Sequence, residues 1–209
     1  MVLDNPIVLV PSLVPTVIAL FFEFLARWVF AQQYIVYGAI VSTPNIMLLI
    51  LGLFIAGILG FIANCMVIDM ANDVFSQRKP NLSRSFRLVM DRIATLIILA
   101  VIAVILTVII IGIPIAFFLA IVAIVEGAGV SESLSRAISF VYKNLGSVIV
   151  FIIIVIVVVI ILSLIPVVGS ILNWVASITF TVAAVNLYIS LKAPPTPPPP
   201  PELPPPPEV

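Results

Sequence analysis

The chain has 209 residues, of which 63% are hydrophobic and 9% charged, and its nine basic residues balance its nine acidic ones. Its mean hydropathy is +1.38. A soluble domain of this length has too little interior to hide so much apolar surface, so we expect the lipid bilayer to be the solvent for most of the chain. The zero net charge does not favour nucleic acid as a partner.

The residue types that most often carry chemistry are scarce. The sequence has no histidine, which is the commonest metal ligand and general base, and its only cysteine, Cys65, lies inside an apolar run. It contains no nucleophile motif, no phosphate-binding glycine loop and no dinucleotide fingerprint. We therefore expect no catalytic activity, no cofactor and no metal site.

Six apolar stretches predict an all-α, polytopic bundle of six transmembrane helices. They run from about Ile7 to Phe30, Ile46 to Met70, Ile93 to Ile111, Pro114 to Val125, Leu145 to Ile165 and Pro166 to Leu191. The fourth is shorter than the roughly 17 residues that a spanning helix needs, and it qualifies only if Gly127 to Val130 complete the helix. The first lacks the basic start of a signal peptide, so we expect it to stay as an anchor.

Charge placement predicts the orientation of these stretches. Eight of the nine basic residues follow the second, fourth or sixth stretch, and Arg27 is the exception. By the positive-inside bias, we expect a multi-pass protein of the cell membrane with both termini in the cytoplasm. Two aromatic belts follow from this orientation. The outer belt holds Trp28, Tyr34, Tyr37 and Trp174, and the inner belt holds Tyr142 and Tyr188.

The chain contains an apparent internal repeat with a spacing of 52 residues. Leu82-Ser83-Arg84 returns as Leu134-Ser135-Arg136, and Pro114 returns as Pro166. The predicted repeat units are 82–130 and 134–191. Each begins with an amphipathic helix and continues with two apolar runs separated by a proline. The apolar face is marked by Leu82, Phe86, Val89 and Ile93 in one unit, and by Leu134, Ile138, Val141 and Leu145 in the other.

The two amphipathic segments, 82–92 and 132–143, favour helices in the headgroup plane of the membrane. Their basic side chains would then contact anionic lipid headgroups. The candidates for this contact are Arg84, Arg87, Arg92 and Lys143. Alternatively, both helices pack against the cytoplasmic end of the bundle.

The segment 193–209 differs from the membrane domain, 1–192, because eleven of its seventeen residues are proline. This composition predicts a disordered, cytoplasmic polyproline II tail. Such a tail is either a solvated spacer or a ligand for a domain with an aromatic groove.

Two pairs of charged residues stand four positions apart, so that each pair shares a helix face. Glu23 and Arg27 lie in the first stretch, where a charge suggests a substrate or proton pathway, although the pair can also neutralise itself near the outer surface. Asp69 and Asp73 end the second stretch. They either hold a cation or pair with Arg84, Arg87 or Arg92 and dock the first amphipathic helix.

Glu126 ends the fourth stretch, where the helix dipole opposes a carboxylate, so we expect a cationic partner. Arg136 and Lys143 are the nearest cations in the sequence.

The stretch from Ile121 to Leu145 carries a family resemblance. It resembles a segment that recurs in uncharacterised six-span prokaryotic membrane proteins, which are related to the membrane domain of some glycerophosphodiester phosphodiesterases. The matching residues are Glu126, Gly127, Gly129, Leu134, Arg136, Lys143 and Asn144, whereas Ser133 and Ile138 replace the usual alanine and large aromatic residue. The resemblance covers residues 5–191 and implies a six-helix fold in an inner membrane of archaeal type. It implies no activity.

Three functions compete on this sequence. The first is a non-catalytic integral membrane protein that acts as a scaffold, a complex subunit or a lipid-organising element. Its partners would be the bilayer with its anionic headgroups, other membrane subunits or a second copy of the chain. The second is a small-solute or lipid transporter, for which Glu23 with Asn64 is the only indication. The third is a membrane enzyme, or the membrane-embedded accessory domain of a lipid-metabolising enzyme.

Overall fold

The computed structural model describes residues 5–37, 39–109, 112–165 and 168–192, and this part of the chain is mostly helical, which confirms the all-α prediction. The predicted tail, 193–209, and Pro166 lie outside the described residues. The elements are η1 (Pro6–Leu9), α1 (Val10–Phe24), η2 (Leu25–Val29), β1 (Gln32–Val36), β2 (Ala39–Thr43), α2 (Ile46–Phe75), α3 (Leu82–Asp91), α4 (Ile93–Thr107), α5 (Gly112–Glu126), α6 (Val130–Lys143), α7 (Leu145–Ser163) and α8 (Val168–Lys192).

Four helical stretches are long and apolar enough to cross a membrane. They are Pro6–Val29, Ile46–Phe75, Leu145–Ser163 and Leu172–Lys192. Two further candidates are bent helix pairs, in which α3 meets α4 at 74° and α5 meets α6 at 120°. The described residues therefore hold four spanning candidates, or six if each bent pair counts as one span.

The helix at the fourth predicted span, α5, is shorter than a spanning helix needs to be. The condition that Gly127 to Val130 complete the helix is not met, because Gly127 has a φ of +67° and α5 ends at Glu126. Glycine is the residue that adopts this left-handed conformation readily after a helix. α4 and α5 each have 15 residues, or about 22 Å of helix against a hydrocarbon core of about 30 Å.

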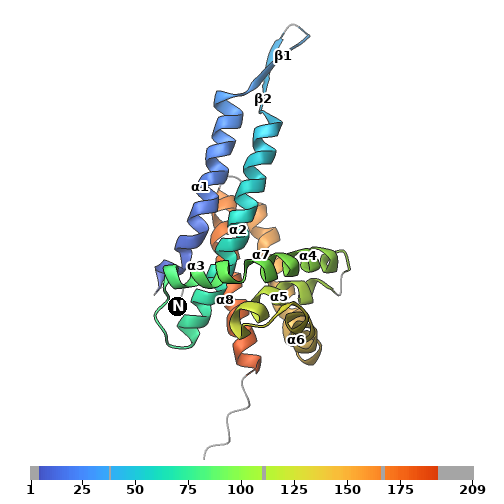
Figure 1. Cartoon of the computed structure of the whole chain (residues 1–209). Helices are drawn as coiled ribbons and strands as arrows, with labels where there is room; N and C mark the ends of the chain where they lie inside the picture. The colour runs from blue at the N-terminus through green and yellow to red at the C-terminus, as the bar shows by residue number, and fades with distance from the viewer. Residues whose placement is uncertain (1–4, 38, 110–111, 166–167, 193–209) are drawn as a thin grey trace, which may run out of the picture.

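α1 and α2 lie side by side as a long arm that extends away from the other helices (Figure 1). At its tip, β1 and β2 form an antiparallel hairpin in which Gln32 faces Thr43 and Val36 faces Ala39. Sequence reasoning did not predict these strands in the uncharged segment 31–45. Tyr37, which follows β1, has a φ of +51°. In the sequence, the pair Tyr37-Gly38 between two runs rich in β-branched residues is a recognisable hairpin signal.

The hydrophobic core lies at the other end of the arm, where the C-terminal halves of α2 and α8 pack around α5. Its fully buried side chains include Ile68, Met70, Val89, Leu96, Phe118, Leu119, Val122, Val148 and Val185. Elsewhere the apolar surface is largely exposed, and only 6% of the most apolar stretch of α7 is buried. A surface of this kind needs lipid or another apolar partner to cover it.

Trp174 lies at a different level from the one that the outer aromatic belt requires. Its indole Nε1 donates a hydrogen bond to the carbonyl oxygen of Ser12, at 3.4 Å, near the start of α1. Trp28 lies about 24 Å farther along the same helix, at 1.5 Å per residue. The α1–α2 arm therefore extends well beyond the start of α8, and the prediction that Trp174 and Trp28 share one belt is wrong.

α3 is a separate helix that lies across α2 (Figure 1) and packs against it. Its buried side chains are Ser85 and Val89, whereas Phe86 is 49% exposed and Leu82 is 36% exposed. The predicted apolar face is therefore split between the protein and the surroundings. In α6 the equivalent face is more enclosed, because Leu134 and Ile138 are half-buried against the core.

Candidate functional site

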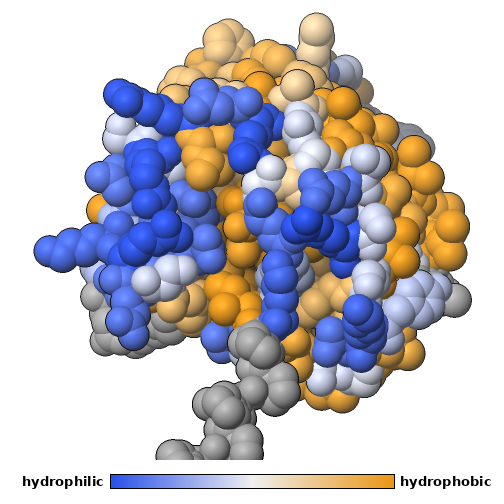
Figure 2. Space-filling view, turned by 60° about the horizontal axis from the view of Figure 1, so that its bottom comes forward, coloured by the Kyte–Doolittle hydropathy of each residue, from blue (hydrophilic) through white to orange (hydrophobic). Residues whose placement is uncertain are grey.

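Two groups of charged side chains lie at the end of the molecule where α2 ends and α3 and α6 begin, which we call the charged end. Figure 2 looks onto this end and shows hydrophilic residues in two groups with hydrophobic residues between them. The first group joins α2 to α3, and the second joins α5, α6 and α8.

In the first group, two carboxylates of α2 hold one arginine of α3. The side chain of Asp69 is 5% exposed and that of Asp73 is fully buried, and both pair with the guanidinium of Arg84. The Ser85 hydroxyl donates a hydrogen bond of 2.6 Å to Asp69 Oδ2. Arg78 Nε lies 3.2 Å from Asp73 Oδ1, but this oxygen accepts no hydrogen bond from the described residues. The arrangement docks α3 on α2, as one of the two sequence alternatives expected.

The second group is built around Glu126, the last residue of α5, whose side chain is 5% exposed. Arg136 of α6, Lys192 of α8 and the hydroxyl of Tyr188 all contact its carboxylate. The Tyr188 ring in turn packs against Phe140, with centroids 4.7 Å apart. Three cationic or hydroxyl donors offset the burial of one carboxylate and the unfavourable helix dipole. One side chain thus joins three helices.

Sequence reasoning named Arg136 as a partner for Glu126 and missed Tyr188 and Lys192. These two residues lie four apart on α8, so they share a face, but they are more than sixty positions from Glu126. Only the packing of α8 beside α5 brings them close. Lys143, the other predicted partner, forms no ion pair with Glu126 within the described residues.

Glu23 and Arg27 form an ion pair of 2.9 Å on the far arm, and both side chains are about half exposed. The pair lies where α1 passes into the π-helical turn η2. It is separate from the charged end and does not line the cavities described below.

Arg87 and Arg92 line an open pocket of about 610 Å³ between α3 and the turn Gly127–Gly129. We call it the α3 pocket. Arg84 and Asp91 also line it. The guanidinium of Arg92 lies over Gly127 and donates to the carbonyl oxygen of Ala123, at 3.4 Å, near the C-terminus of α5. A cation is favourable at this end of the helix dipole.

We expect Gly127→Ala to lower the free energy of unfolding by about 1–2 kcal/mol, because a side chain is strained at positive φ. A Cβ there would also lie 2.8 Å from an Arg92 nitrogen and displace the guanidinium. The matched control is Gly129→Ala, whose Cβ would meet nothing within 4 Å. Thermal unfolding in detergent compares the two variants, and an equal loss in both would contradict this description of the turn.

Two cavities meet at Asn64 in the middle of α2. The larger, about 580 Å³, opens between α1, α2, α7 and α8, and the smaller, about 210 Å³, lies between α2, α4 and α5. Asn64 and Thr181 line both, and the Thr181 hydroxyl lies 3.0 Å from Asn64 Oδ1. Both cavities are mostly apolar and no charged residue lines either of them. Glu23, Asn64 and Glu126 therefore do not share one cavity.

In the described part of the chain, no group of three acidic or cysteine side chains lies close enough to hold a metal ion. Comparison with known proteins does not assign the chain to a group: no protein-family profile, curated protein or solved structure matches it.

Proposed function

We propose that the chain is a non-catalytic, multi-pass protein of the cell membrane that organises lipid or other membrane subunits at its charged end. The observation that carries this proposal is the use of the buried charges. Asp69, Asp73 and Glu126 are each held by cations from a neighbouring helix, so they join helices together. The two cavities that meet at Asn64 are mostly apolar, and no charged residue lines them.

The charged end would face the cytoplasm under the positive-inside bias. α1, α2, α7 and α8 would cross the bilayer, and α4 and α5, which extend sideways from α2 in Figure 1, would form a helical hairpin that begins and ends at the charged end. This arrangement keeps both termini on one side whether the hairpin crosses fully or not. The start of η1 and the end of α8 lie toward the same end of the molecule (Figure 1), which supports it.

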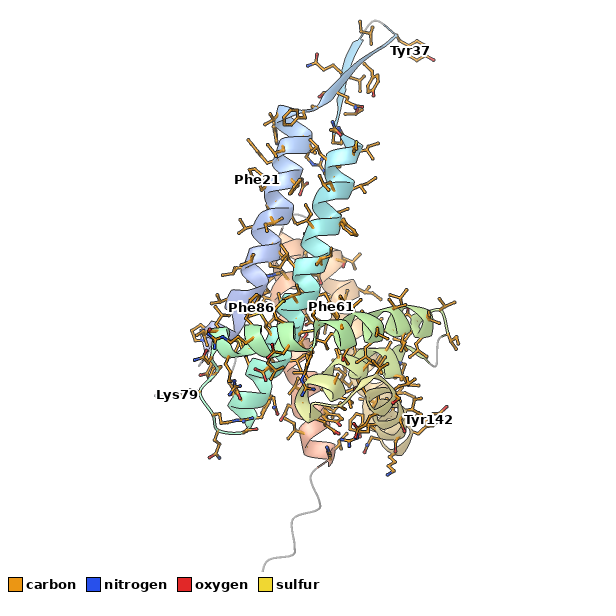
Figure 3. All side chains as sticks on the ribbon, viewed as in Figure 1. Phe21, Tyr37, Phe61, Lys79, Phe86 and Tyr142 are labelled. Atoms are coloured by element: carbon orange, nitrogen blue, oxygen red, sulfur yellow. The ribbon has the colours of Figure 1, made fainter. Side chains whose placement is uncertain are left out.

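α3 would lie at the membrane surface, pinned to α2 by Arg84 and facing lipid with Leu82 and Phe86. Figure 3 shows Phe86 on α3 at the level where the arm joins the other helices. Exposed apolar residues beside arginines are typical of helices at the headgroup boundary. This combination favours a lipid-organising function over a purely structural one.

A depth measurement tests the proposal. We expect a spin label on Phe86→Cys to be relaxed more strongly by oxygen, which concentrates in the acyl region, than by a water-soluble nickel chelate. The matched control is Ser83→Cys, an exposed position on the polar side of the same helix, where the nickel chelate should dominate. Both variants are made with Cys65→Ala. Equal exposure to water at the two positions would contradict a surface-bound α3.

A transporter of small solutes or lipids remains the second candidate, because the larger cavity opens between helices beside the Asn64–Thr181 pair. Its apolar lining suits an acyl chain better than an ion. Transport of a fluorescent phospholipid across vesicles that contain the protein, abolished by Asn64→Leu, would support this candidate over the first.

The family proposal rests on the residues of the segment 121–145. In the structure, its glycine positions form the turn after α5, and its glutamate and arginine, Glu126 and Arg136, pair with each other. The residues that carry the resemblance would then maintain the turn and the ion pair, which are structural features, and would not take part in a reaction.

A further inference from the structure

The α3 pocket has a counterpart in the second proposed repeat unit. We call it the α6 pocket, an open space of about 410 Å³ between α6 and the end of α8. α3 lines its pocket with Arg84, Arg87, Leu88, Asp91 and Arg92. α6 lines its pocket with Arg136, Ser139, Phe140, Lys143 and Asn144. The two sets correspond one by one at the repeat spacing of 52 residues.

The equivalence extends to the helix geometry and the ion pairs. The helical run is interrupted at Arg92 in one unit and at Asn144 in the other, with φ and ψ of −113° and 10° against −120° and 29°. In each unit the first arginine reaches back to carboxylates at the end of the preceding helix. Arg84 pairs with Asp69 and Asp73 of α2, and Arg136 pairs with Glu126 of α5. The two pockets are therefore built on the same plan.

The two pockets differ in the basic side chains that remain outside these ion pairs. The α3 pocket keeps Arg87 and Arg92, and no carboxylate of the described residues lies within ion-pair distance of either. The equivalent positions in the α6 pocket are Ser139 and Asn144, and Glu126 engages Arg136 and Lys192 there. Of its lining cations, Lys143 alone forms no ion pair with the described residues. Two arginines on one wall suit a phosphate group, whose oxygens accept several hydrogen bonds from guanidinium.

The turn before α6 forms the other side of the α3 pocket. Gly127, Ala128 and Gly129 line it, and α6 begins directly after them without a side-chain cap on its first N–H groups. Uncapped N–H groups at a helix start favour an anion. The carboxylate of Asp91, which also lines the pocket, repels an anion, so its substitution provides a test.

The surroundings of the α3 pocket point to a lipid phosphate rather than a soluble one. Phe86 is exposed on the same helix, and Ile97, Ile98 and Val101 are exposed on α4, which continues from the pocket. Acyl chains attached to a bound headgroup would have an apolar surface to follow. A soluble phosphate compound would leave that surface uncovered.

We propose that the α3 pocket binds the phosphodiester headgroup of one anionic phospholipid between Arg87, Arg92 and the turn Gly127–Gly129, and that the α6 pocket, which has serine and asparagine in place of these two arginines, is its weaker counterpart. This proposal rests on the proposed function, because it requires the charged end to lie at the membrane surface. It goes further in assigning the lipid contact to one pocket rather than to all the basic residues.

The test measures binding of phosphatidylglycerol to the full chain in phosphatidylcholine nanodiscs or mixed micelles, with native mass spectrometry to count bound lipids. We expect Arg87→Ser, which installs the residue of the equivalent position, to weaken binding about fivefold, the effect of losing one basic residue near an anionic headgroup. Arg92→Asn does the same for the other arginine. We expect Asp91→Lys, again the equivalent residue, to strengthen binding by at least this factor.

The charge-matched control is Lys79→Ser, which removes one exposed cation at the charged end but outside the pocket. A loss equal to that of Arg87→Ser would overturn the pocket, because general surface charge would then explain the binding. The spin-label result for α3 would be unaffected, so this failure is distinguishable from failure of the proposed function. Arg92→Asn also removes the contact to Ala123, but Asp91→Lys removes no described contact and therefore keeps the proposal testable.

A second experiment with inorganic phosphate distinguishes a lipid headgroup from a soluble phosphate as the ligand. We expect it to compete weakly with phosphatidylglycerol at millimolar concentrations and to give no stabilisation that depends on Arg87 in lipid-free detergent. Strong Arg87-dependent stabilisation by phosphate, together with no preference for phosphatidylglycerol over phosphatidylcholine, would overturn the lipid assignment.

Discussion

Replacing Arg84 with methionine should lower the free energy of unfolding by about 2–3 kcal/mol. The substitution keeps the apolar stem and removes the cation from Asp69 and Asp73, which are 5% and 0% exposed. Breaking a buried ion pair typically costs 3–5 kcal/mol, because one buried charge remains without a partner. We expect less here, since Arg84 itself is 44% exposed and Arg78 stays beside Asp73. The midpoint of thermal unfolding in detergent should fall by about 5–10 °C.

Two further variants separate the ion pair from a general effect of charge. Arg87→Met removes an exposed arginine of the same helix and should change the free energy of unfolding by less than about 0.5 kcal/mol. Asp73→Asn combined with Arg84→Met should lose less stability than Arg84→Met alone, because the most deeply buried charge is then neutral. If the double variant is the less stable one, Arg84 does not act through Asp73.

Replacing Gly52 with leucine should separate α1 from α2 and lower the free energy of unfolding by about 3 kcal/mol. A Cβ at this position would overlap the side chain of Phe22, so the helices approach too closely here for any side chain. Overpacking of this kind typically costs 1–3 kcal/mol, and leucine adds three carbons beyond Cβ. Thermal unfolding and the rate of proteolysis at the β-hairpin would both report the change.

Gly57→Leu is the matched control for this contact. Gly57 lies in the same helix, but a Cβ there would meet nothing within 4 Å. The substitution should be neutral or raise stability by up to about 1 kcal/mol, since leucine favours a helix more than glycine does. Similar losses at both glycines would mean that α1 and α2 are not held at Gly52.

Much of the helical pattern could be predicted because apolar runs and their breaks are local properties of a sequence. The start of α2 at Ile46 and the break before Leu145 appear where the sequence places them. The end of α5 at Glu126 also falls where the sequence places it, although the glycines after Glu126 permit a continued helix as readily as a turn. Only the positive φ of Gly127 distinguishes the two.

Features that depend on tertiary packing were harder to predict. The split of the α3 face between Val89 and Phe86 depends on how the helix rotates to bring Ser85 and Arg84 to Asp69. The contacts of Tyr188 and Lys192 with Glu126 join residues far apart in the chain. The level of Trp174 depends on where α8 docks along α1, which no local pattern records.

The central claim, that the charged end faces the cytoplasm, is tested most directly by the accessibility of two single cysteines. Tyr37 lies at the tip of the β-hairpin and Lys79 lies in the connection after α2, at opposite ends of the molecule (Figure 3), and both side chains are exposed. With Cys65→Ala, a membrane-impermeant maleimide should label Tyr37→Cys in intact cells and Lys79→Cys only after permeabilisation. Labelling of Lys79→Cys in intact cells, with Tyr37→Cys protected, would contradict the orientation and the lipid contact proposed at the charged end.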